Sequence, residues 1–274
     1  MSSHDVSGTN QHNSPGTPSD DQVMVDIVIP VLNEAHVLAK SVEAVRRFLT
    51  DNASWKWRVV VVDNGSHDGT DDVARRLVAQ YPDVRFLQLP QRGRGRALRA
   101  AWTQSDADIM CYTDVDLSTE MEALPKLVHA LLHEGYDLGT GSRLLPASKT
   151  QRSLKREAIS RIYNVIVKVV LGTSFSDAQC GFKVLSRAVV HEIIPQVQDE
   201  SWFFDTELLA LSERQHFRIK DLPVAWMEDD DSRVKIVPTA WADLKGVARL
   251  RMKFWREGYQ PSRRAAAAVT ERAT

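Results

Sequence analysis

Short, largely apolar runs alternate with stretches of helical periodicity through the first half of the chain. The apolar runs have the length and the β-branched content of buried strands, and they lie at 25–32, 58–62, 84–87 and 109–113. The segments between them repeat apolar residues as helices do, near 37–49, 71–78 and 96–102. This strand–helix alternation predicts an α/β fold with a mostly parallel sheet flanked by helices.

Polar side chains follow three of these runs directly. Asn33 and Glu34 come after the first run, Asp63 after the second, and Asp114 after the fourth, with Asp116 two positions further on. Ligands of open α/β sheets bind at the carboxyl ends of strands, so we expect these side chains at one edge of the sheet. Two neighbouring carboxylates repel each other unless a cation lies between them, and such oxygen ligands favour Mg²⁺ or Mn²⁺. Solvated loop acids are the alternative that the residues alone leave open.

Length, charge and cysteine content limit the class of protein. The 274 residues allow one large domain, which we expect at 23–258, between a disordered tail at 1–22 and a flexible one at 259–274. The net charge of −1 gives no reason to expect a nucleic-acid partner. Two cysteines, Cys111 and Cys180, favour a reducing compartment over a disulfide framework. No window approaches the ~18 uninterrupted apolar residues of a membrane-spanning helix.

Two further segments, near 149–170 and 240–256, combine Lys and Arg with apolar residues at helical spacing. The second also carries Trp255. Basic amphipathic helices of this composition bind membrane interfaces. An apolar stripe on a helix serves equally well for packing in a core, so both interpretations stay open.

The order of these motifs resembles that of family 2 glycosyltransferases, which have the GT-A fold. In the first half the resemblance rests on the segments 27–34, 61–70 and 114–116. Three segments of the second half are similar to motifs of dolichyl- or polyprenyl-phosphate sugar synthases. They are Gly-Ser-Arg at 141–143, Asp-Ala-Gln-Cys-Gly-Phe-Lys at 177–183 and Phe-Phe-Asp-Thr-Glu-Leu-Leu at 203–209. The residues of these motifs are most similar to those of dolichyl-phosphate β-glucosyltransferases. The resemblance covers about 25–255.

The resemblance implies a donor site, a metal site and an acceptor site. The residues expected to contact the nucleotide-sugar donor are Pro30, Asn33, Glu34, Asp63, Arg94, Asp114, Val115, Asp116, Arg233 and Lys235. Asp114 and Asp116 would hold Mg²⁺ or Mn²⁺, and Asp116 and Asp205 would be the catalytic residues, although Ser118 stands where the family often has Gln. Cationic or hydroxyl-bearing candidates for the acceptor's phosphate are Arg143, Arg152, Ser153 and Arg156.

We therefore expect a metal-dependent, inverting transfer of glucose from UDP-glucose to a polyprenyl or dolichyl phosphate, by a protein held peripherally at the cytoplasmic face of a membrane. A phosphate acceptor is already anionic at neutral pH, so Asp205 need not remove a proton and can instead orient the donor sugar or the acceptor. The alternatives are a GDP-mannose donor, a soluble acceptor, or a silent protein that only binds nucleotide sugars. The sequence does not indicate the oligomeric state.

Overall fold

The computed structural model describes residues 19–151, 153–227 and 236–258. Most of the expected N-terminal tail, the whole expected C-terminal tail, and the candidate site residues Arg152, Arg233 and Lys235 lie outside the described residues. The last residues before the first strand form one turn of 3₁₀ helix, η1 (Asp20–Gln22).

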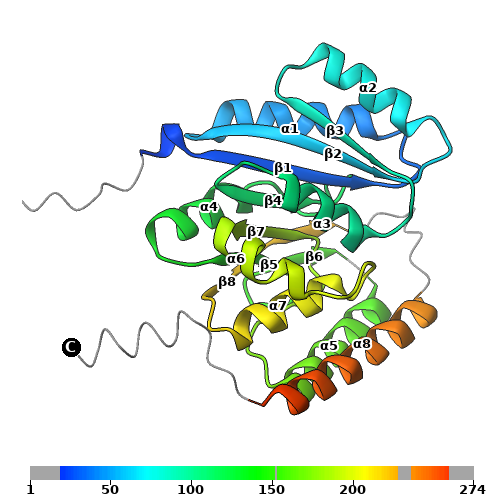
Figure 1. Cartoon of the computed structure of the whole chain (residues 1–274), viewed down its shortest axis with the longest axis vertical. Coiled ribbons are helices and arrows are strands. Elements are labelled where there is room, and N and C mark those ends of the chain that lie inside the picture. The colour runs from blue at the N-terminus through cyan, green and yellow to red at the C-terminus, as the bar shows by residue number, and fades with distance from the viewer. Residues whose placement is uncertain (1–18, 152, 228–235, 259–274) are drawn as a thin grey trace, which may run out of the picture.

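A seven-stranded sheet organises the described part of the chain, in the order β3-β2-β1-β4-β7-β5-β8 (Figure 1). Its strands are β1 (Met24–Val31), β2 (Lys56–Asn64), β3 (Val84–Leu89), β4 (Ile109–Thr113), β5 (Leu138–Ser142), β7 (Phe182–Ser186) and β8 (Ile219–Pro223). β1 to β4 run parallel, as do β5 and β8, whereas β7 is antiparallel to both of its neighbours. The predicted mostly parallel sheet is confirmed, and the four predicted strands lie where the apolar runs are.

Helices cover both faces of this sheet and enclose two hydrophobic cores. One core includes residues of α1 (Leu38–Asn52), α2 (Thr70–Gln80) and α4 (Ala123–His133). The other includes residues of α3 (Arg94–Gln104), α6 (Arg187–Glu192), the short η2 (Ile194–Gln196), α7 (Phe204–Arg214), α5 (Leu154–Leu171) and α8 (Ile236–Glu257). In α1 the buried apolar residues are Leu38, Val42, Val45 and Leu49, whose spacing places them on one face of a helix.

Because β7 is antiparallel to β4, the residues that precede β7 lie at the same edge of the sheet as the residues that follow β4. Thr113, the last residue of β4, pairs with Phe182, the first residue of β7. The amino end of β7 therefore lies at the same edge as the carboxyl end of β4. Cys180 and Gly181, which precede β7, are brought beside the Asp114–Asp116 segment, which follows β4.

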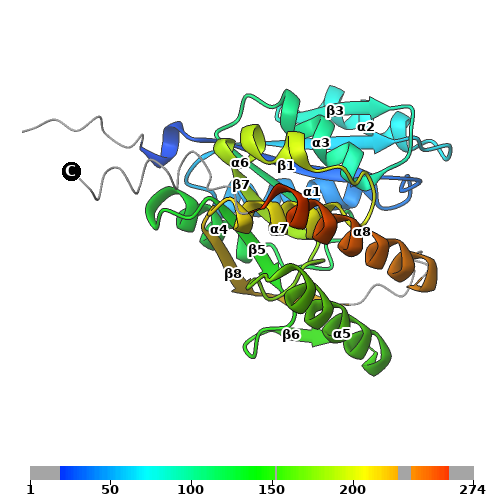
Figure 2. The ribbon, with the colours of Figure 1, turned by 60° about the horizontal axis from the view of Figure 1, so that its bottom comes forward.

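α5 and α8 lie side by side at the end of the molecule away from α1 and α2 (Figures 1 and 2). One face of each helix enters the core, through Tyr163 and Val167 of α5 and through Val247 and Leu250 of α8. α5 begins at Leu154 rather than near 149, because the preceding residues form β6 (Lys149–Gln151), which pairs with β9 (Ala225–Met227). Among the described residues, none of the helices has both the length and the apolar content that crossing a bilayer requires.

A buried ion pair ties α8 to α7. Glu207, in the first turn of α7, is fully buried and accepts hydrogen bonds from both terminal nitrogens of Arg249, at 2.9 and 2.8 Å. The backbone N–H of Asp199 also donates to Glu207, at 2.9 Å. Gly246 of α8 packs so closely on Phe203 that a Cβ there would lie 2.5 Å from the ring. The position of α8 is thus fixed against the helix that carries Asp205.

Candidate active site

The loops after β1 and β2 hold each other in place. Asn33 adopts a left-handed conformation, with φ 58°, which Asn tolerates better than most residues. Its N–H donates to Ser66 Oγ at 2.8 Å, and its side-chain oxygen accepts from the N–H of His67 at 2.8 Å. The N–H of Glu34 donates to Thr70 Oγ1 at 2.9 Å. The two loops therefore form one preorganised wall at the carboxyl edge of the sheet.

Asp63 lies beneath this wall with an incomplete set of hydrogen bonds. It is fully buried in β2, next to Val31 of β1, the residue that follows Pro30. Its Oδ1 accepts from the N–H of Ser66 at 3.0 Å, whereas its Oδ2 is buried and has no partner among the described residues. An unpaired buried carboxylate oxygen costs free energy. Asp63 is therefore suited to accept an N–H from a bound ligand, in agreement with its expected contact with the nucleotide-sugar donor.

Arg94 joins two acids that are far apart in the sequence. It is the first residue of α3, and its Nη2 donates to Asp114 Oδ1 at 2.6 Å while its Nη1 lies 3.3 Å from Asp205 Oδ2. Asp205 lies in the first turn of α7 and is 2% exposed. The guanidinium carbon of Arg94 also lies 5.1 Å from the ring centre of Trp202. Three residues expected in the site are thus brought together in one cluster.

Two residues of this cluster were missed by sequence reasoning. The hydroxyl of Tyr112 donates to Asp205 Oδ1 at 2.7 Å, and Lys183 Nζ lies 3.2 Å from the same oxygen. Lys183 is fully buried and also donates to the carbonyl of Cys180 at 2.8 Å. Burial raises the pKa of Tyr112 well above its ordinary value. The signal for Lys183 was available, since a lysine within an apolar strand is buried only when it has a partner.

Asp114 and Asp116 follow β4, as expected. The side chain of Asp114 remains 39% exposed, although partial burial and the charges of Asp116 and Asp205 raise its pKa against the opposing effect of Arg94. Asp116 is exposed, and its Oδ1 accepts from the N–H of Ser118 at 3.0 Å. The backbone of Gly181 abuts Asp114, because a Cβ there would lie 1.8 Å from Asp114 Oδ2. Val115 is partly buried between the two acids.

The described residues alone do not offer a complete metal shell. In the described part of the chain, no group of three or more His, Cys, Asp or Glu side chains is placed to hold a metal ion. Asp114 and Asp116 provide two carboxylates, and Asp114 gives one of its oxygens to Arg94. Mg²⁺ is commonly held by one or two carboxylates together with water and substrate phosphates. The donor set fits such a shared cation.

Arg143 has a protein partner that the sequence did not reveal. Its Nε and Nη2 donate to Asp177 Oδ2 and Oδ1, at 2.7 and 2.9 Å, and its backbone N–H donates to Asp177 Oδ2 at 3.1 Å. Although burial alone would raise it, this pairing lowers the pKa of Asp177 to about 2. Any phosphate contact of Arg143 would therefore use its remaining nitrogen, Nη1. Ser153 caps the start of α5 by accepting from the N–H of Arg156 at 3.5 Å.

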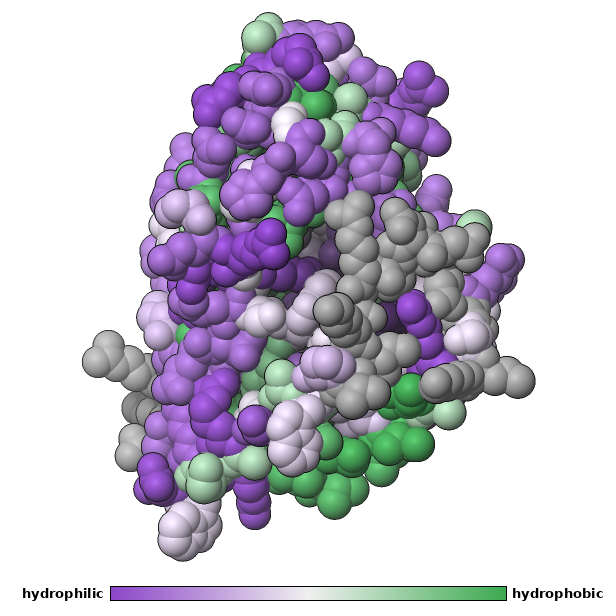
Figure 3. Space-filling view, turned by 90° about the vertical axis from the view of Figure 1, so that its right-hand side faces the viewer, coloured by the Kyte–Doolittle hydropathy of each residue, from purple (hydrophilic) through white to green (hydrophobic). Residues whose placement is uncertain are grey.

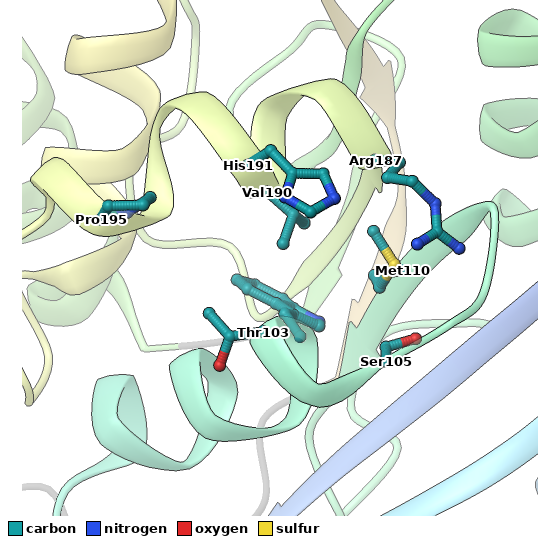
Figure 4. Close-up of a pocket in the computed structure, with 8 residues that line it drawn as sticks. Thr103, Ser105, Met110, Arg187, Val190, His191 and Pro195 are labelled. Carbon is teal, nitrogen blue, oxygen red and sulfur yellow. The ribbon is translucent and has the colours of Figure 1, made fainter.

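A small pocket lies outside this site. Figure 4 shows Val190 and His191 of α6 facing Thr103 of α3 around a cavity of about 80 Å³. Met110, at the amino end of β4, also lines it. The pocket is therefore at the opposite end of β4 from Asp114.

Comparisons with known proteins agree on the type of protein. Residues 26–194 match the family described as Glycosyl transferase family 2. The chain is 35% identical to the glycosyltransferase AglD of Haloferax volcanii over 238 residues, 85% of this chain but only 37% of AglD. It is 27% identical to the dolichyl-phosphate β-glucosyltransferase of Saccharomyces cerevisiae over 255 residues, 86% of this chain and 76% of that protein.

The solved structures show the same fold. The glucosyl-3-phosphoglycerate synthase of Mycobacterium tuberculosis, in complex with Mn²⁺, UDP-glucose and phosphoglyceric acid, superposes with a TM-score of 0.61. The sequence identity is 18%, and the match covers 84% of this chain and 79% of that one. This likeness confirms the expected GT-A fold.

Replacing Gly181 by Ala should disturb the site through Asp114. The new methyl group would overlap Asp114 Oδ2, so Asp114 and Arg94 must move. We expect the affinity for UDP with Mn²⁺ to fall about tenfold or more, measured by titration calorimetry. Gly172→Ala is the control, because a Cβ at Gly172 meets nothing within 4 Å, and its strained φ affects stability and not the site. Unchanged affinity in Gly181→Ala would contradict the described geometry.

The Asp177–Arg143 pair should produce a defined pH dependence of stability. Because the folded-state pKa of Asp177 is about 2, below the unfolded value of about 3.9, its contribution is present above pH 4 and disappears as the pH falls towards 2. This difference in pKa corresponds to roughly 2 to 3 kcal/mol. In urea unfolding, the stability difference between the native protein and Asp177→Asn should be constant above pH 5 and shrink below pH 4. Glu134→Gln removes the exposed contact with Lys220, which solvent screens, and should leave stability almost unchanged at every pH.

Proposed function

Because the chain belongs to glycosyl transferase family 2, we propose that it transfers glucose from UDP-glucose to a polyprenyl or dolichyl phosphate at a membrane surface. The observation that carries this proposal is the cluster of Arg94, Asp114 and Asp205 at the carboxyl edge of the sheet. The incomplete Asp63 lies at the same edge, at the end of β2. The names of the curated relatives supply the sugar and the lipid acceptor.

Features at the two ends of the site support a position for the donor. The unpaired oxygen of Asp63 can accept the imino N–H of a pyrimidine base, and the wall formed by Asn33 and Glu34 lies above it. The diphosphate would then lie near Asp114 and Asp116 with a shared divalent cation. When bound, that cation neutralises the negative charge that develops on the departing diphosphate.

The role of Asp205 follows from its surroundings. Both of its oxygens face donors, namely Tyr112, Lys183 and Arg94. An anionic phosphate acceptor does not require a general base, so Asp205 can serve to position its neighbours. We infer that Asp205 holds Arg94 beside the reacting centre while an acceptor phosphate oxygen attacks the anomeric carbon and UDP leaves.

The surface of α5 and α8 supports contact with a lipid acceptor. Exposed apolar side chains on these helices include Ile162, Val165, Val169, Trp241, Leu244, Met252 and Trp255. Figure 3 shows apolar side chains gathered at the lower edge of the molecule, where α5 lies. Exposed basic residues of α8 accompany them, namely Lys245, Arg251 and Arg256. Apolar and basic side chains together favour an anionic membrane interface.

Transfer assays with purified protein and a short-chain polyprenyl phosphate test the reaction. We expect UDP release from UDP-glucose with Mg²⁺ or Mn²⁺, and loss of transfer in chelator. Asp116→Ala should lower kcat about 100-fold or more, because the diphosphate loses its cation. Glu120→Ala, an exposed acid on the same loop, is the control.

Other outcomes would replace the proposal. Preference for GDP-mannose would change the sugar and the base, and transfer only to phosphoglycerate would make the acceptor soluble. Binding of UDP-glucose without turnover for any acceptor would indicate a silent nucleotide-sugar-binding protein. If a chelator does not reduce the rate of transfer, the reaction does not depend on a divalent cation.

Membrane contact is tested separately by flotation with vesicles that contain anionic lipid. Replacing both Trp241 and Trp255 by Ser should reduce the bound fraction, because their exposed rings would no longer enter the interface. We expect a loss of about tenfold in partitioning, and weaker binding of the native protein at high salt. Val78→Ser, an exposed apolar residue on α2, is the control. Equal partitioning of both variants would contradict the proposed orientation.

A further inference from the structure

A second cavity, of about 210 Å³, lies between the segment before α7 and the first turns of α8. Asp199, Ser201 and Trp202 line it on one side, and Thr239 and Asp243 line it on the other. Trp202 is also the residue that contacts the guanidinium of Arg94. The cavity therefore shares a wall with the cluster that holds Asp114 and Asp205.

Asp243 is the unusual residue of this cavity. It is 3% exposed, and its Oδ2 accepts from Gln179 Nε2 at 2.5 Å. Its Oδ1 is buried and has no hydrogen-bond partner among the described residues. Burial, together with the charges of Asp199 and Asp205, raises the pKa of Asp243 to about 6 against the opposing effect of the hydrogen bond from Gln179. Asp243 thus has one unpaired acceptor oxygen and lies close to Asp205. Asp63 has a similar unpaired oxygen at the opposite end of the site.

Gln179 connects Asp243 to the rest of the site. Its backbone N–H donates to Asp177 Oδ1 at 3.1 Å, so the Arg143–Asp177 pair fixes this segment. Two residues further on, Gly181 abuts Asp114. The side chain of Asp243 is therefore oriented by the same loop that shapes the metal-binding end of the site.

The chemistry of the lining selects the kind of ligand. The described residues around this cavity provide carboxyl groups, hydroxyl groups and aromatic rings, and no Lys or Arg. A phosphate would be repelled by Asp199 and Asp243. Hydroxyl groups of a sugar can instead donate to these carboxyls, and its C–H face can lie against Trp202. The volume is below the roughly 300 Å³ at which pockets for drug-sized ligands begin, which suits one sugar ring.

We propose that this cavity receives the hexose of the donor and that Asp243 determines sugar specificity by accepting a hydrogen bond from one of its hydroxyl groups. The inference rests on the proposed function, because it assumes a UDP-hexose donor. Gln179 is the positioning residue that holds the carboxyl of Asp243 in place.

The test compares the binding of UDP-glucose and of UDP, each with Mn²⁺, by titration calorimetry. Asp243→Asn keeps the shape of the side chain. Its oxygen can accept from Gln179 Nε2 as the Asp oxygen does, which leaves an amide nitrogen, a donor, where the unpaired acceptor was. We expect the affinity for UDP-glucose to fall about tenfold or more while the affinity for UDP stays unchanged. The thermal midpoint should not fall, because an incompletely paired buried carboxyl is removed. The ratio of kcat/KM for UDP-glucose to that for UDP-galactose should also shrink.

One control variant and one further test variant make the possible outcomes distinguishable. Asp221→Asn removes another carboxyl that has an unpaired buried oxygen but lies on β8, and it should alter neither affinity. Thr239→Val should weaken UDP-glucose alone, and it decides the matter if Asp243→Asn does not fold. Equal loss of UDP and UDP-glucose, or no loss of either in folded variants, would overturn the assignment. If the native protein binds UDP but gains nothing from the glucose, the proposed donor fails instead.

Discussion

The contact of Arg94 with Asp114 and Asp205 is the interaction on which the functional edge of this protein depends. The three residues come from the start of α3, the end of β4 and the first turn of α7, so one guanidinium joins three elements of the fold. Without Arg94, two acids would lie close together in a partly buried place, and at least one would be driven to take up a proton. The positive charge of Arg94 opposes the rise in the pKa of Asp114 that burial and the neighbouring acids cause, where a metal and a diphosphate are expected.

Incomplete hydrogen bonding marks the rest of the site. Asp63 and Asp243 are buried, and each has one carboxylate oxygen without a partner among the described residues. Folding alone does not favour such groups. Their positions on either side of the Arg94 cluster suggest a ligand with N–H groups at one end and hydroxyl groups at the other, which is the chemistry of a nucleotide sugar.

The sequence predicted the parts of this arrangement that depend on local pattern. The four buried runs became β1 to β4, and Asn33, Asp63 and Asp114 lie at their carboxyl ends, because parallel strands place those ends at one edge. The direction of β7 could not be read, since an apolar run does not record which way its strand points. For that reason Gly181, which precedes an antiparallel strand, was not expected beside Asp114. The Arg143–Asp177 pair was also missed, because contacts 34 residues apart leave no periodic signal.

The first turn of α7 is held from two directions. Asp205 is drawn towards the sheet by Arg94 and Lys183, and Glu207 is drawn towards α8 by Arg249. The first turn of α7 therefore connects the outermost helix, α8, to the reaction centre. Amino acid changes that weaken the packing of α8 would therefore shift Asp205 without contacting any ligand. The outer helix is part of the active-site architecture as well as of the surface.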